Sequence, residues 1–153
     1  ENINATNLNF RSKSSIRTRP KKEFVDPSIA TAVLDISPND LLNDLKMFGF
    51  MFESLCLRDL KVYTQRFGAD ITFYRDENDF EVDAVIRTGS GKWGAVEIKL
   101  GAGYIEEVAT NLLKFKDKVD TSVCGEPSFL MVLTGTNYSY KREDGVYVVS
   151  IGT

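Results

Sequence analysis

The sequence predicts an α/β fold in which a mixed central sheet is flanked by helices. Three strand-like runs follow one another over residues 71–100, and the turns between them are short enough for hairpins. An amphipathic helical pattern then covers residues 104–119, and two further strand-like runs close the chain. A strand–helix–strand step after a meander indicates parallel and antiparallel pairs in one sheet. The predicted order is α-β-β-β-α-β-β.

The first 22 residues predict a linker or an extended arm. They are rich in Asn, Ser and Thr, and they carry six basic side chains against one acidic side chain. Two interpretations of this basic segment remain open, a solvated tail and an arm that contacts phosphate groups. Residues 23–153 are then expected to form a single domain, which their length allows.

Two helices are expected before the first strand. A short helix is predicted for residues 24–34, where Asp26 supplies a cap and Pro27 a first-turn proline. A longer helix is predicted for residues 40–67, because Pro38 just precedes it and Gly68 suits the position after its last turn.

The strands are predicted at residues 71–75, 82–88, 93–100, 128–134 and 146–151. The helix at 104–119 keeps apolar side chains at helical spacing. These side chains are Ile105, Val108, Ala109, Leu112, Phe115 and Val119. The aromatic side chains of Trp93, Tyr104 and Phe115 are expected in core or edge packing.

Composition limits the chemistry that is open to the chain. It has no histidine, which excludes Ser-His-Asp catalysis and histidine-based zinc sites. Oxygen ligands from Asp and Glu would favour Mg²⁺, Mn²⁺ or Ca²⁺. Cys56 and Cys124 lie far apart, which predicts no disulfide and a reducing, cytoplasmic setting. No apolar run approaches the roughly 20 residues of a membrane span.

The charge is distributed unevenly. The whole chain has a net charge of −3, and residues 1–22 contribute +5, which leaves −8 for residues 23–153. Bulk charge alone is therefore not expected to bind the globular part to nucleic acid.

Charged residues inside apolar runs form the candidate site. Glu97 and Lys99 are two apart in the strand-like run 93–100 and therefore share a face. In the preceding run Asp83 shares a face with Glu81 and Val85. If the two strands pair, Asp83 and Glu97 come close enough to share a cation.

A fourth charged residue, Glu53, lies on the apolar stripe of the long predicted helix. It should therefore face the core, where it could reach a metal directly or through water. Buried charges are costly unless they pair or hold a metal. Glu97 and Lys99 taken alone also fit exposed ion pairs with residues of neighbouring strands on a solvated face. The addition of Asp83 and Glu53 favours a site.

At these residues the sequence resembles a known family. Asp83, followed one hairpin later by Glu97-Ile98-Lys99, is similar to the Asp … Glu-x-Lys signature of PD-(D/E)XK nucleases, with Val82 where proline is frequent. Glu53 resembles the helical acid of several members. The resemblance implies a restriction-endonuclease-like core and DNA as substrate.

The resemblance also implies roles for the residues of this site. Asp83, Glu97, the Ile98 carbonyl and Glu53 would bind Mg²⁺ or Mn²⁺. Lys99 would orient or deprotonate the attacking water and offset charge on the phosphate. No Gln or basic residue follows early in the next helix.

A second resemblance covers most of the chain. The stretches FVDPSIA (24–30), GFMFE (49–53), FEVD (80–83) and VEIK (96–99) resemble a C-terminal domain of unknown function in prokaryotic AAA+ ATPases. The basic stretch 11–19 resembles the segment before that domain. The chain has no G-x-x-x-x-G-K-[ST] loop, so the ATPase region is expected to be absent here and to be the partner domain of the same polypeptide.

Three functions remain open from the sequence. The first is a metal-dependent DNA nuclease, and the second is a catalytically inactive module for protein interaction or ATPase regulation. The acidic charge of residues 23–153 favours the second. A Ca²⁺-binding or purely structural domain is the third.

Overall fold

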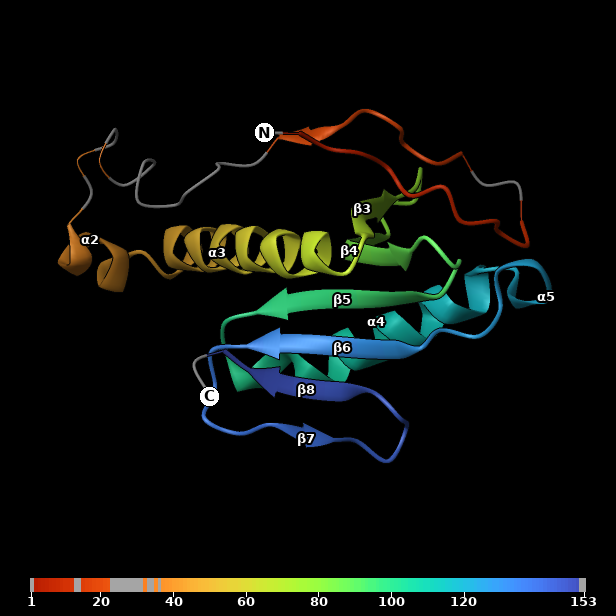
Figure 1. Cartoon of the computed structure of the whole chain (residues 1–153). Helices are drawn as coiled ribbons and strands as arrows, with labels where there is room; N and C mark the ends of the chain where they lie inside the picture. The colour runs from red at the N-terminus through yellow and green to blue at the C-terminus, as the bar shows by residue number, and fades with distance from the viewer. Residues whose placement is uncertain (1, 13–14, 23–31, 33–34, 36, 152–153) are drawn as a thin grey trace.

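The computed structural model describes residues 2–12, 15–22, 32, 35 and 37–151. Its centre is a mixed six-stranded sheet with the strand order β3-β4-β5-β6-β8-β7, flanked by helices (Figure 1). The predicted α/β class and the mixed sheet are therefore confirmed. Apart from Ala32, the short helix predicted at residues 24–34 lies outside the described residues.

The first half of the sheet is the predicted meander. Strands β3 (Ala69–Arg75), β4 (Glu81–Thr88) and β5 (Trp93–Lys99) pair antiparallel in sequence order. Strands β6 (Phe129–Thr134) and β8 (Tyr147–Ser150) continue the sheet in parallel. The two-residue strand β7 (Tyr140–Lys141), which the sequence did not predict, adds an antiparallel edge.

Helix α4 covers one face of this sheet. It spans Ile105–Lys118 after the 3₁₀ turn η1 (Ala102–Tyr104), close to the predicted range, and a short helix α5 (Thr121–Cys124) follows. Figure 1 shows α4 behind β5, β6 and β8. Its predicted apolar stripe packs on buried side chains of the sheet, and Trp93 meets Phe115 edge-on in this core.

Two helices replace the single helix predicted for residues 40–67, so that prediction is wrong. Helix α2 spans Pro38–Asn43 and helix α3 spans Leu45–Arg66. Asp44 interrupts them because its side chain accepts the Met47 N–H at 3.0 Å and caps α3. Gly68 follows α3 with a φ of +65°, as predicted.

Helix α3 covers the opposite face of the sheet. Cys56 and Leu57 pack there against Val96 and Ile98 of β5. The central strand β5 is thus covered on both sides, and all its residues except Lys99 are buried. A carboxylate in this strand therefore lies in the interior.

Residues 2–12 and 15–22 form an extended arm that packs on the domain. Strands β1 (Asn2–Ile3) and β2 (Lys21–Lys22) pair with each other, and Ala5 forms a parallel bridge to Phe73 of β3. Ile3 and Leu8 are each only 5% exposed. Three of its basic side chains, Arg11, Arg17 and Lys21, bond to groups of the domain.

The cysteines and the helices bear on two expectations from composition, the absence of a disulfide and of a membrane span. Cys56 and Cys124 are both free thiols. Within the described part of the chain, no helix has both the length and the apolar character that crossing a membrane requires.

Candidate functional site

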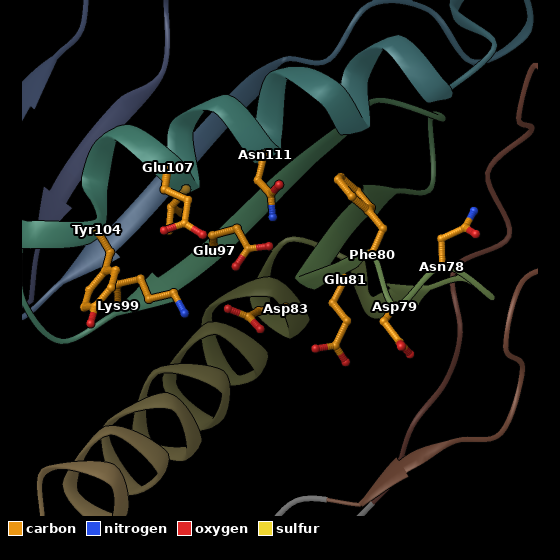
Figure 2. Close-up of a pocket in the computed structure, with 11 residues that line it drawn as sticks. Asn78, Asp79, Phe80, Glu81, Asp83, Glu97, Lys99, Tyr104, Glu107 and Asn111 are labelled. Carbon is orange, nitrogen blue, oxygen red and sulfur yellow. The ribbon is translucent and has the colours of Figure 1, made fainter.

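A cavity of about 460 Å³ lies where the first residues of β4 and the last residues of β5 meet helix α4 (Figure 2). Its wall contains three of the four charged residues predicted for the site, Asp83, Glu97 and Lys99. The remaining lining residues are Asn78, Asp79, Phe80, Glu81, Tyr104, Glu107, Val108 and Asn111. We refer to this space as the acidic cavity.

A β-bulge at the start of β4 positions Asp83. Thr72 of β3 pairs with Val85, whereas Tyr74 pairs with Val82, so that Asp83 and the residue after it together oppose a single residue of β3. Val82 and Val85 consequently join the same core cluster although they are three residues apart. The alternation predicted for residues 81, 83 and 85 is therefore interrupted, since a bulge re-aims side chains.

The pairing of β4 with β5 brings the two predicted carboxyls together. The ladder ends at the pair Ala84–Val96, and one further step along both strands places Asp83 opposite Glu97. The two carboxyl groups are hydrogen-bonded to each other. Asp83 Oδ2 also accepts the Ile98 N–H at 2.8 Å, which fixes the carboxylate against β5.

Burial gives this pair unusual protonation behaviour. Glu97 is only 6% exposed, so an exposed cross-strand ion pair is the wrong interpretation of this residue. Burial raises the pKa of Glu97 far above its usual range, and the neighbouring Asp83 charge raises it further. Burial and then the charge of Glu53 also raise the pKa of Asp83. Without a cation, the pair therefore keeps a proton at neutral pH.

Glu53 of α3 lies near the pair but has a partner of its own. Its Oε1 accepts a hydrogen bond from Lys21 Nζ of the arm at 2.7 Å. Its negative charge contributes to the raised pKa values of Asp83 and Glu97. Among the described residues, no three Asp, Glu or Cys side chains are grouped closely enough to hold a metal ion together. A contact from Glu53 to an ion through water stays a prediction.

The backbone of Ile98 adds a further oxygen on this side of β5. The N–H and C=O of a strand residue point toward the same neighbouring strand. Because the Ile98 N–H points at Asp83, its carbonyl also faces β4, beyond the last paired residues. Mg²⁺ commonly takes one or two carboxylates and keeps several waters, so this oxygen set fits the ion.

Lys99 is exposed and lines the acidic cavity, and its positive charge partly offsets the rise in the pKa of Glu97. Figure 2 shows Lys99 and Glu97 projecting from β5 into the space that Glu107 and Asn111 of α4 face from the other side. Lys99 and Glu97 thus line the same cavity, as expected for residues two apart in one strand.

Three lining residues at the start of the helical segment, Tyr104 of η1 and Glu107 and Asn111 of α4, were missed or misread. Tyr104, expected in packing, is 60% exposed and lines the cavity with Glu107 and Asn111. Spacings of three and four residues place these side chains on one helix face, which is a signal available in the sequence. Trp93 and Phe115 are buried in the core, as expected.

Comparison with known proteins assigns the chain to a family. Residues 48–153 match the family described as Domain of unknown function (DUF4143). The chain belongs to this family. No curated protein and no solved structure matched the chain. The DUF4143 region contains Asp83, Glu97, Lys99 and Glu53, whereas Lys21 and the rest of the arm lie before it.

Proposed function

We propose that this DUF4143 domain binds Mg²⁺ or Mn²⁺ in the acidic cavity and hydrolyses phosphodiester bonds of DNA. The observation that carries the proposal is the carboxyl pair formed by half-buried Asp83 and buried Glu97. Two carboxyls this close cannot both ionise without a compensating charge. A divalent cation would supply that charge in place of the shared proton.

Each residue of the site has a role that follows from its position. Asp83, Glu97 and the Ile98 carbonyl would hold the ion, and waters and the substrate phosphate would complete its coordination. When bound, the ion supplies a Lewis acid for the phosphate and makes an attacking water easier to deprotonate. Lys99 donates a hydrogen bond to that water or to a phosphate oxygen, and its charge offsets the negative charge that develops there.

The proposal includes a restriction-endonuclease-like core. Its support is the order of elements, a β3–β4–β5 meander followed by α4 and the parallel strand β6, with the carboxyl pair on β4 and β5. The ATPase domain of the same polypeptide is the proposed partner, on the resemblance of residues 24–30, 49–53, 80–83 and 96–99 to such domains.

Removal of one carboxyl tests the metal site. We expect wild type to bind Mn²⁺ in isothermal calorimetry and Asp83→Ala to bind it at least about 100-fold more weakly, because a ligand is lost. Asp79→Ala is the matched control. Asp79 lines the same cavity but its side chain is 79% exposed, so affinity should stay within about twofold of wild type.

Plasmid and branched-DNA cleavage, with Mg²⁺ and with Mn²⁺, completes this test. Metal-dependent cleavage by wild type that Asp83→Ala lacks is the expected result. Mn²⁺ binding without any cleavage would support the proposed metal site and reject the proposed nuclease activity. Absence of Mn²⁺ binding by wild type would reject both.

A second candidate function is an inactive module for protein interaction or ATPase regulation. It is favoured by three large apolar side chains at the end of α3. Val62 is 49%, Tyr63 60% and Phe67 80% exposed. The deciding comparison is ATPase activity of the whole polypeptide with and without this domain, since regulation requires a difference.

A further inference from the structure

We propose that a second, basic cavity beside the acidic cavity binds the phosphate backbone of a nucleic acid strand and presents the neighbouring phosphate to Asp83 and Glu97. The binding of the nucleic acid backbone is argued from the contacts below. The delivery of a phosphate to Asp83 and Glu97 rests on the proposed function. The basic cavity measures about 440 Å³. Its lining residues are Arg17, Arg19, Pro20, Lys21, Phe73 and Arg75.

The arm and the sheet edge build this cavity together. The Arg17 N–H donates to the Arg75 carbonyl at 2.8 Å, and Ile16 forms an antiparallel bridge to Asp76. The last residues of the arm are thereby held beside β3. Arg17, Arg19 and Lys21, two residues apart along the arm, converge with Arg75 on one space.

Ion pairs join the basic cavity to the acidic cavity. Arg17 pairs with Asp79 at 3.0 Å, and Arg75 pairs with Glu81. Both acids line the acidic cavity, whereas both arginines line the basic one. Lys21 is bonded to Glu53, whose charge acts on the carboxyl pair. A nucleic acid strand that binds in the basic cavity would therefore lie next to the candidate metal site.

Two of these cations, Arg17 and Arg19, are exposed and available to phosphate. The side chains of the Arg17–Asp79 pair are 50% and 79% exposed, and so exposed an ion pair contributes little to stability. A phosphate can therefore replace the carboxylate as partner. Arg19 is exposed, and within the described part of the chain it makes no ion pair.

The chemistry of the cavity selects a phosphodiester chain. The arginine guanidinium binds phosphate oxygens through paired hydrogen bonds, and three of the four cations here are arginines. Several cations distributed along an extended arm suit a polyanion better than one small anion. Local charge also explains how a domain with −8 over residues 23–153 could bind DNA.

Fluorescence anisotropy with a labelled single-stranded oligonucleotide tests this inference. EDTA is present, so neither metal binding nor cleavage enters the result. We expect Arg19→Ala to weaken binding at least about fivefold and to lower the slope of log K against log salt by about one. Arg19→Lys should keep most of that slope. The matched control is Lys92→Ala, an exposed cation in the turn at the other end of β4, which should bind as wild type does.

Three outcomes would overturn the inference. The first is no binding of the oligonucleotide by wild type, and the second is equal affinity and slope for Arg19→Ala and Lys92→Ala. The third is displacement of the oligonucleotide by equimolar inorganic phosphate or ATP, which would assign the cavity to a small phosphate ligand. Loss of Mn²⁺ binding in Asp83→Ala is measured separately, so each proposal can fail without the other.

Discussion

Glu97→Gln should raise the midpoint of thermal unfolding at about pH 8 in the absence of divalent cations, and change it little at about pH 5. Burial raises the pKa of Glu97 to about 10, whereas an unfolded chain has a Glu pKa of about 4.3. Between these values the folded protein binds a proton that the unfolded chain releases. The stability of wild type therefore falls as pH rises through this window.

The neutral amide of glutamine removes this pH-dependent cost. We expect a gain on the order of 3 kcal/mol at about pH 8, which corresponds to several degrees in scanning fluorimetry. Mn²⁺ should raise the unfolding midpoint of wild type and leave that of Glu97→Gln unchanged, because the variant lacks the Glu97 carboxylate as a ligand.

Glu107→Gln is the matched control for this measurement. Glu107 lines the same cavity but is exposed, so its replacement should not alter the pH dependence. A wild-type stability that stays level from about pH 5 to about pH 9 would show that Glu97 is ionised without a cation, contrary to its burial.

Lys99→Met should lower the rate of metal-dependent DNA cleavage by about 10²–10³-fold and leave Mn²⁺ affinity near that of wild type. Methionine keeps much of the side-chain length and removes the ammonium. Lys99 is exposed and lines the cavity without belonging to the metal's oxygen ligands. The loss should therefore appear in kcat at saturating metal and not in the unfolding midpoint.

The Lys92→Met variant controls for the loss of one surface charge, and it should cleave at the wild-type rate. Cleavage by Lys99→Met at the wild-type rate, with Asp83→Ala inactive, would remove Lys99 from the mechanism. Glu107, which faces the same space from α4, would then be the residue to replace next.

The β4–β5 hairpin and helix α4 could be predicted from the sequence, because contacts between residues close in the chain determine them. Strands β4 and β5 are joined by a short turn, and the Thr88 N–H donates to the Lys92 carbonyl across it. Such a turn sets the hairpin register, so the juxtaposition of Asp83 and Glu97 follows from their positions in the chain. The helix α4 was predictable for the same reason, since its apolar spacing is continuous.

Features that depend on contacts between residues far apart in the chain could not be predicted from local sequence pattern. Ile3 and Leu8 are single apolar residues in a polar segment, and only packing on the sheet shows that the arm belongs to the domain. The partnership of Lys21 with Glu53 depends on that packing. The bulge at Asp83 requires β3 as partner. At Asp44, a side-chain cap competes with helix continuation, and the apolar spacing is the same for both outcomes.

The most direct test of the central claim is anomalous diffraction from crystals of the domain soaked in Mn²⁺. Binding by the carboxyl pair predicts a single strong anomalous peak between Asp83 and Glu97, within about 2.0–2.3 Å of their carboxylate oxygens. Crystals of Asp83→Ala should lack this peak. A wild-type map with no peak at this pair, from crystals that bind Mn²⁺ elsewhere or not at all, would contradict the account.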